Sequence, residues 1–88
     1  MIVEYAPRFK RAYRKLGREE QRPIAEAIRR FLDDPGHPSL RVKKMQGMPN
    51  VWEARASDSL RITFQRDGER VILRNVRYPR SDAEAAVV

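Results

Sequence analysis

The sequence predicts an α+β fold in the order β-α-α-β-β-β, in which an N-terminal helical hairpin packs on one face of an antiparallel sheet. Two observations lead to this prediction. Apolar residues repeat with the helical period of about 3.6 before residue 36, and they alternate as in a strand after residue 50. The residues between, 36–50, contain prolines and glycines and are typical of a loop. This order of elements favours a sheet with both helices on one side.

The first elements are a short strand and a helix. Residues 2–5 are β-prone and predict the strand. Pro7 suits the first turn of the helix, where its missing N–H would have no partner in any case. Gly17 is predicted to end the helix as the residue just beyond its last turn. The apolar stripe of this helix consists of Phe9, Ala12, Tyr13 and Leu16, and its opposite face is basic.

A second helix follows almost at once. Glu19 and Glu20 lie near its start, where negative charge suits the helix dipole. Pro23 is predicted to lie in or before the first turn, since proline breaks a helix interior. The Asp-Asp-Pro-Gly sequence at residues 33–36 predicts the end of the helix. The short connection predicts that the two helices form an antiparallel hairpin.

Three strands are predicted after residue 50. Alternating apolar residues mark the first two, around Trp52–Ala56 and Leu60–Gln65. Asp67 and Gly68 predict a tight turn, from which Val71–Val76 returns as the third strand. Because apolar side chains should share one face, a three-residue loop at residues 57–59 is favoured over a two-residue loop.

This register predicts an apolar face for the helices and a polar face with clustered arginines. It places Arg55 opposite Arg61, and Arg61 opposite Arg74. Like charges directly opposite each other destabilise a sheet unless an anion lies among them, which indicates a phosphate site. The alternative is the ordinary charged, solvent-facing side of an antiparallel sheet. The predicted polar face collects Glu53, Arg55, Arg61, Thr63 and Arg74.

The length and charge of the chain restrict its organisation and its partners. Its 88 residues predict one domain, residues 1–88. It has 19 Lys and Arg against 12 Asp and Glu, a formal net charge of +7. A surplus of this kind predicts a polyanionic or acidic partner. No acid lies between Asp34 and Glu53, whereas three basic residues do: Arg41, Lys43 and Lys44.

Composition also excludes several classes of protein. The chain has no cysteine and one histidine, so disulfides, thiolate catalysis and the usual structural zinc sites are excluded. The histidine, His37, is expected to serve a loop or capping role. No P-loop, dinucleotide fingerprint, catalytic triad or metal-ligand cluster is present, so no cofactor or metal is expected. No apolar run is long enough for a membrane span and no signal peptide is visible, which predicts a cytoplasmic protein.

The predicted polar face has groups suited to cleavage of an RNA phosphodiester. Attack by the RNA's own 2′-hydroxyl needs a base, charge stabilisation on the phosphate, and an acid for the leaving oxygen. Arg55 and Arg61 are the candidates for charge stabilisation, since both are ionised at any relevant pH. Glu53 is the only carboxylate predicted on that face and is the candidate base. Tyr78 and Arg80, just after the last strand, are the candidate acids.

Short motifs along residues 9–76 carry a family resemblance through their order and spacing. They are K-L-G (Lys15–Gly17), D-P-G-H-P-S-L (Asp34–Leu40), K-K-M-Q-G-M-P (Lys43–Pro49), W-E-A-R (Trp52–Arg55) and L-R-I-T-F (Leu60–Phe64). Together they resemble the RelE/ParE superfamily of toxins from bacterial type II toxin–antitoxin systems. The resemblance covers most of the chain and implies the same β-α-α-β-β-β fold.

The resemblance implies two candidate activities. RelE-like members are ribosome-dependent endoribonucleases (mRNA interferases) that inhibit translation, whereas ParE-like members act on DNA gyrase and are not nucleases. Both kinds are inhibited by an antitoxin with a largely helical segment, so an acidic, helical antitoxin is the implied partner. The remaining alternatives are a catalytically degenerate relative and a nucleic-acid-binding module without catalysis.

The motifs also imply roles for individual residues. Arg61 corresponds to the phosphate-stabilising arginine of the nucleases, whereas Glu53 lies where the RelE prototype has a lysine. Pro79 lies where many members have a catalytic histidine, and Arg80 takes the place of an arginine in the RelE prototype. The candidate catalytic residues are therefore Arg61, Arg80, Arg55, Glu53 and Tyr78. The candidate RNA contacts are Lys43, Lys44, Arg41, Arg74, Arg77, Arg11 and Arg14.

Overall fold

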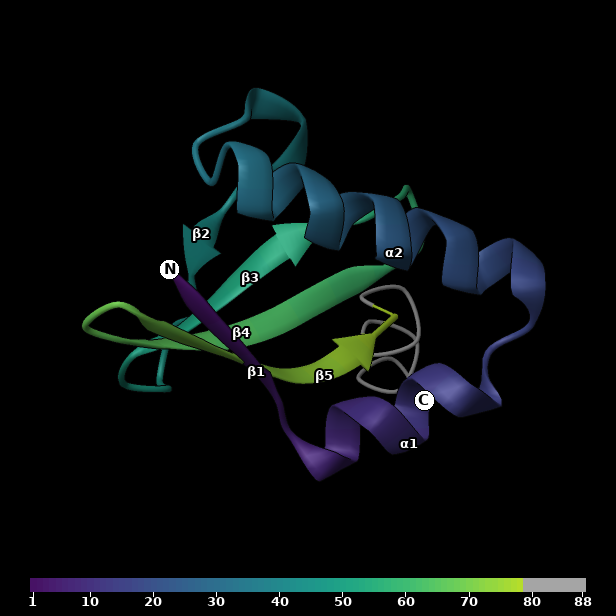
Figure 1. Ribbon diagram of the computed structural model, residues 1–88, viewed down its shortest axis with the longest axis horizontal. Helices are drawn as coiled ribbons and strands as arrows, with labels where there is room; N and C mark the ends of the chain where they lie inside the picture. Colours follow the sequence, from purple (N-terminus) through teal and green to yellow (C-terminus); the bar gives the residue numbers. More distant parts are fainter. Residues whose placement is uncertain (79–88) are drawn as a thin grey trace.

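The computed structural model describes residues 1–78 and has the α+β fold that the sequence predicts (Figure 1). Neither helix of this part of the chain is long and apolar enough to cross a membrane. In chain order the elements are β1 (Ile2–Tyr5), α1 (Pro7–Lys15), α2 (Arg18–Asp33), the 3₁₀ helix η1 (Pro38–Leu40), β2 (Lys43–Lys44), β3 (Val51–Arg55), β4 (Arg61–Asp67) and β5 (Arg70–Arg77).

The strands form one sheet in the order β1-β5-β4-β3-β2. The pairs β2–β3, β3–β4 and β4–β5 are antiparallel as predicted, but β1 is parallel to β5. Parallel pairing is possible because β1 and β5 are joined by most of the domain rather than by a hairpin turn. Strand β2 was not predicted, since two residues are too few to show an alternating pattern.

Two details of the helices differ from the prediction. Gly17 does not end α1 in a left-handed conformation: its φ is −72°, and it is the N-cap of α2, where its N–H donates to Glu20 Oε1 at 3.3 Å. Helix α2 begins at Arg18, so Pro23 lies inside the helix rather than in its first turn. The expected capping role of His37 is confirmed, since its Nδ1 accepts from the Ser39 N–H at 3.1 Å at the start of η1.

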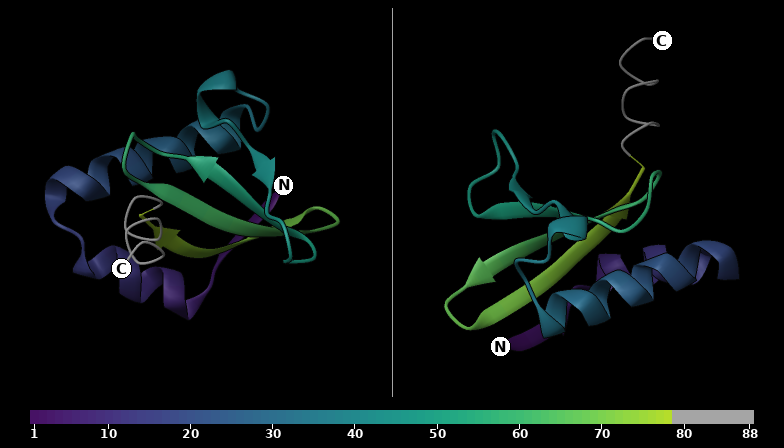
Figure 2. Two further views of the ribbon diagram at one scale, coloured as in Figure 1. Left: turned by 180° about the vertical axis from the view of Figure 1, so that it is seen from behind. Right: turned by 90° about the horizontal axis from the view of Figure 1, so that it is seen from above.

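Both helices cover the same face of the sheet, and the core fills the space between the helices and the sheet (Figure 2). Helix α2 is joined to β4 by Phe31 and Phe64, whose ring centroids are 4.9 Å apart. Trp52 packs at the edge of this core, as predicted. The main buried side chains are Phe9, Ile24, Ala27 and Phe31 from the helices and Ala54, Ile62, Phe64, Val71, Leu73 and Val76 from the sheet.

The register of β3 against β4 is confirmed, and the register of β4 against β5 is not. Arg55 lies opposite Arg61, as the three-residue loop predicted. The turn between β4 and β5, however, consists of Gly68 and Glu69 rather than Asp67 and Gly68. This moves the pairing by two residues, so the apolar side chains still share one face.

A β-bulge changes the pairing again near the end of β5. The partners of β4 jump from Leu73 to Asn75, which leaves Arg74 as the extra residue. Arg61 therefore lies opposite Arg77, and the predicted pairing of Arg61 with Arg74 is wrong. The bulge shifts the alternation of β5 by one residue, so that its buried side chains are Val71, Leu73 and Val76. One buried residue beyond the bulge was too little to reveal this shift from the sequence.

Candidate functional site

Three arginines lie in a row across the face of the sheet that the helices leave uncovered, here called the open face. Arg55 on β3 lies opposite Arg61 on β4, which in turn lies opposite Arg77 on β5. Side chains at directly opposite positions on one face are about 4.5–5.5 Å apart at Cβ. This arginine row is the cluster that the sequence predicted, with Arg77 in place of Arg74 as its third member.

The loop between β3 and β4 fixes two members of the arginine row. Arg55 donates to the Asp58 carboxylate in that loop. Arg61 donates from Nη1 to the carbonyl oxygens of Ser57 and Leu60, the latter at 3.0 Å. Asp58 and these carbonyls offset part of the repulsion between like charges, and they hold the guanidinium groups in defined positions. The sequence pattern did not indicate Asp58 as a partner of Arg55.

Beside the arginine row the open face is hollowed into a groove of about 530 Å³, the open-face groove. Three arginines line it: Arg8 from the first turn of α1, and Arg74 and Arg77 from β5. Arg74 donates to Gln65 Oε1 at 3.1 Å. The other lining side chains are Ala6, Met45, Met48, Val51, Thr63, Gln65, Ile72 and Asn75. The groove combines apolar side chains, polar side chains and arginines. It is therefore suited to a nucleotide, whose base has flat faces that pack on apolar groups and whose phosphate is anionic.

Glu53 lies next to the arginine row but is already paired. It is only 7% exposed, which is unusual for a carboxylate. One of its oxygens is 3.7 Å from Lys43 Nζ on β2, and the other is 3.5 Å from Arg77 Nη1 on β5. The structure therefore brings the candidate base together with two candidate RNA contacts, Lys43 and Arg77.

Tyr78 is held away from the open face. Its hydroxyl donates a hydrogen bond to the Glu20 carboxylate on α2, and its ring packs against the core. The hydrogen bond, followed by burial and the charge of Glu20, raises the pKa of Tyr78 to about 12. The structure thus does not bring Tyr78 together with Glu53. The remaining catalytic candidate, Arg80, lies outside the described residues.

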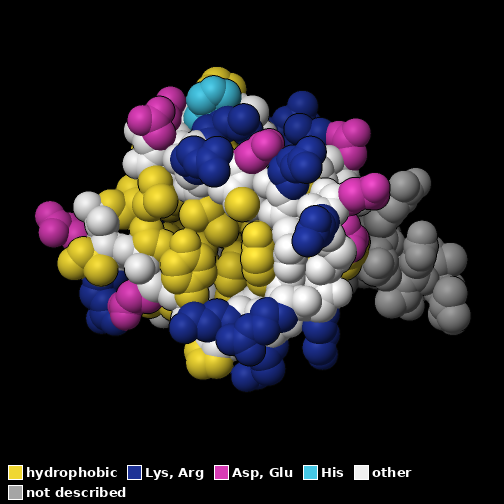
Figure 3. Space-filling model, turned by 45° about the vertical axis from the view of Figure 1, so that its right-hand side comes forward, with side chains coloured by type: hydrophobic (Ala, Val, Ile, Leu, Met, Phe, Trp, Pro, Cys, Tyr) yellow, Lys and Arg dark blue, Asp and Glu magenta, His cyan; other side chains and the backbone are white. Residues whose placement is uncertain are grey.

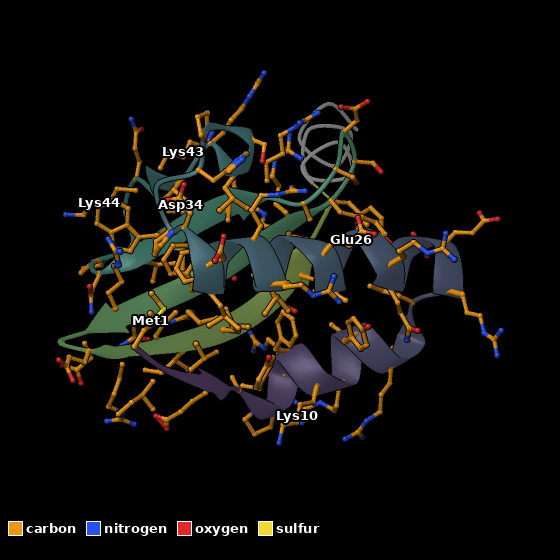
Figure 4. All side chains as sticks on the ribbon, turned by 45° about the horizontal axis from the view of Figure 1, so that its top comes forward. Met1, Lys10, Glu26, Asp34, Lys43 and Lys44 are labelled. Atoms are coloured by element: carbon orange, nitrogen blue, oxygen red, sulfur yellow. The ribbon has the colours of Figure 1, made fainter. Side chains whose placement is uncertain are left out.

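The other predicted RNA contacts are spread over the surface. Lys43 and Lys44 lie on β2, at one edge of the sheet. Helix α1, with Lys10, lies near the other edge, which β1 forms (Figure 4). Arg11 and Arg14 are exposed on α1. Arg41 ends η1 in a left-handed conformation, with a φ of 44°. Within residues 1–78, no three His, Asp or Glu side chains come together to hold a metal ion.

Arg8 is a site residue that the sequence analysis did not single out. It belongs to the basic face of α1, where nothing in the local pattern distinguishes it from its neighbours. Strand β1 pairs with β5, so the helix that follows it, α1, begins beside β5. Arg8 in the first turn of α1 therefore reaches the open-face groove. This pairing joins residues far apart in the sequence, and no local signal in the sequence indicates it.

A second groove, of about 360 Å³, lies between the two helices and is here called the interhelical groove. Its lining is mostly apolar, with Lys10 and Arg14 on the α1 side. A band of apolar side chains with Lys and Arg above and below it is visible from this side (Figure 3). The lining residues are Tyr5, Phe9, Lys10, Tyr13, Arg14, Ala25 and Ile28. The surface therefore combines an apolar floor with a basic border.

Comparison with solved structures identifies the fold. The chain is similar to a RelB–RelE antitoxin–toxin complex from Methanococcus jannaschii, with a TM-score of 0.74, 20% identity and coverage of 94% of this chain and 98% of that chain. It is similar to a YoeB/ParE toxin from Agrobacterium tumefaciens, with a TM-score of 0.71, 17% identity and coverage of 89% and 98%. The isolated RelE toxin of E. coli gives a TM-score of 0.67 and 20% identity over 99% and 98% of the two chains.

Comparison by sequence finds nothing further. No family model matches the chain, and no curated protein is similar to it in sequence. The structural matches nevertheless extend over nearly the whole length of both chains. The chain therefore has the fold of the RelE and YoeB toxins, as the sequence motifs implied.

Proposed function

We propose that this protein is the toxin of a type II toxin–antitoxin system and that it cleaves mRNA on the ribosome. The observation that carries the proposal is the arginine row beside the open-face groove, on the fold of the RelE toxins. Several arginines on one open face are suited to a polyanion such as RNA. A protein that acts on mRNA bound to ribosomes works in the cytoplasm.

The proposed reaction is an internal transfer at phosphorus. The 2′-hydroxyl of one nucleotide gives up its proton as its oxygen bonds to the adjacent phosphorus. The bond from phosphorus to the 5′-oxygen breaks and that oxygen takes up a proton, so that a 2′,3′-cyclic phosphate and a 5′-hydroxyl result. Negative charge builds up on the phosphate oxygens in the transition state, and fixed cations stabilise it. Arg61 is the best placed of the described residues, because backbone carbonyls orient its guanidinium group.

The other four candidate catalytic residues differ in their surroundings and in their proposed roles. Arg55 is proposed to assist Arg61 from the neighbouring strand. Arg80 is proposed to act at the leaving oxygen, since Pro79 replaces the histidine of many family members. Glu53 and Tyr78 remain candidates by sequence position, but the carboxylate of Glu53 is ion-paired and the hydroxyl of Tyr78 is bonded to Glu20.

The proposal is tested with purified bacterial ribosomes programmed with a defined mRNA, by mapping the new 5′ ends. Cleavage should depend on ribosomes, and Arg61→Ala and Arg80→Ala should each lower its rate by about 10²–10³, the loss typical of removing one transition-state donor. Arg29→Ala, which removes an exposed arginine from α2, is the matched control and should cleave normally. Intact mRNA together with gyrase-dependent DNA breaks would instead establish the ParE-like alternative. Intact mRNA without such breaks would indicate a degenerate relative.

We propose an acidic, helical antitoxin as the protein partner. The interhelical groove supports this, because its apolar floor suits the apolar face of a helix and its basic border suits acidic residues. Two similar structures carry toxins of this fold with their antitoxins, the complex from Methanococcus jannaschii and the RelBE complex of E. coli. The test is a binding and stability measurement with an acidic amphipathic peptide.

A further inference from the structure

Glu53 is a buried carboxylate built into a basic surface. It lies on β3 opposite Thr63, in the row next to the arginine row. A buried charge is stable only when it is paired, since burial removes its hydration. Its partners are Lys43 on the neighbouring strand β2 and Arg77 on β5, which lies on the other side of β3 beyond β4. Glu53 thus occupies the position that an external anion would take between these two cations.

The two partners are both accessible to an incoming ligand. The side chain of Lys43 is 72% exposed and that of Arg77 is 29% exposed, whereas the side chain of Glu53 is 9% exposed. Arg77 also lines the open-face groove. A phosphate that approached Lys43 and Arg77 would therefore meet the negative charge of Glu53 immediately behind them.

We infer that Glu53 is an internal substitute for a phosphate group, which pairs with Lys43 and Arg77 in the RNA-free protein and lowers the affinity of this position for RNA. The inference rests on the proposed function, since it assumes that RNA binds the open face. Two physical effects support it: Glu53 competes with phosphate for the same cations, and its charge repels phosphate. Glu53 is then a residue that tunes affinity, and it is not the general base.

The experiment measures the binding of a fluorescent single-stranded RNA oligonucleotide by anisotropy over a series of salt concentrations. Glu53→Gln keeps the shape of the side chain and removes its charge. Glu26→Gln makes the same change on α2, which covers the opposite face of the sheet (Figure 4). At low salt, Glu53→Gln should bind RNA roughly fivefold more tightly than Glu26→Gln, as expected for removal of one like charge at about 4 Å in water.

Two further measurements locate the effect. The salt dependence of Glu53→Gln should steepen by about 0.7 in log–log slope, the value for one more phosphate contact on single-stranded RNA. Adding Lys43→Gln should abolish most of the gain, whereas adding Lys44→Gln, the adjacent lysine, should not. Glu53→Met repeats the test with a second neutral side chain in case Glu53→Gln is unstable.

The outcomes separate this inference from the proposed function. Equal affinities of Glu53→Gln and Glu26→Gln would overturn the inference, and so would weaker binding by Glu53→Gln. If Arg61→Ala and Arg74→Ala bind RNA as tightly as the wild type, the open face is not the RNA site and both ideas fail. If those two variants lose affinity but Glu53→Gln gains none, only the inference fails.

Discussion

The pKa of Tyr78 should lie well above that of a free tyrosine, because its hydroxyl donates to the Glu20 carboxylate. Its pKa is raised from 10.0 to about 12, first by this hydrogen bond and then by burial and by the charge of Glu20. Glu20→Gln should bring the pKa of Tyr78 back toward 10. The measurement is the absorbance of tyrosinate against pH, and Tyr78→Phe identifies the signal among those of Tyr5 and Tyr13.

The same hydrogen bond should make stability depend on pH at the alkaline end. The folded protein holds the Tyr78 proton up to about pH 12, whereas the unfolded chain releases it near pH 10. The stabilisation is therefore complete below about pH 10 and is lost as the pH rises through 12. Between pH 9 and 12, the free energy of unfolding measured with urea should fall less steeply for Glu20→Gln than for the wild type. Glu19→Gln, a change at the exposed neighbouring residue, should behave like the wild type, and equal slopes in all three proteins would contradict this account.

Some side-chain partners could be predicted from the sequence and others could not. The pairing of Arg55 with Arg61 could be predicted, because the short loop and the shared apolar face leave only one register. The partner of Tyr78 could not, because Glu20 is 58 residues away and meets it only when β5 ends beside α2. The partners of Glu53 were missed for the same reason. Side-chain neighbours across distant elements follow from tertiary packing rather than from local pattern.

Among the elements, the hairpin of β4 and β5 depends on one glycine. Gly68 has a φ of +61°, a left-handed conformation that costs other residues about 1–2 kcal/mol. Gly68→Ala should therefore lower the free energy of unfolding by about that amount, measured by urea denaturation. Gly36→Ala is the matched control, because an added Cβ there would meet its nearest atom, Asp34 Oδ1, at an ordinary 3.7 Å.

The control should be close to neutral or slightly stabilising, since alanine reduces the freedom of the unfolded chain. If Gly68→Ala were no less stable than Gly36→Ala, the turn would not have the left-handed conformation assigned to it.

Most helices and strands could be predicted from the sequence, whereas the pairing of the strands could be predicted only in part. Helical and strand periods identify α1, α2, β3, β4 and β5, because each has several apolar residues in contact with one core. The bulge at Arg74 was not predicted, because Val76 alone beyond it is too little to show that the alternation of Val71 and Leu73 has shifted by one residue. The interior position of Pro23 was also missed, since tertiary packing of α2 overrides the local preference.

Across the whole molecule, basic side chains border two hollowed surfaces. The arginine row and the open-face groove lie on one face of the sheet, whereas the interhelical groove lies among the helices that cover the other. The first surface is suited to phosphate, and the second combines apolar and basic character. A partner in the interhelical groove would therefore not need to displace RNA from the open face directly.

A small domain with a net charge of +7 should gain stability from an acidic helical partner. An amphipathic peptide with apolar residues on one face and glutamates on the other should raise the melting temperature. At 100-fold above its Kd it stabilises the protein by about 2.7 kcal/mol, which corresponds to a shift of roughly 10 °C or more in a domain of this size. A peptide of the same composition in scrambled order is the control for charge alone. Ala25→Glu, in the wall of the interhelical groove, should remove most of the shift; equal shifts with the two peptides would mean that charge alone, and not the groove, binds the partner.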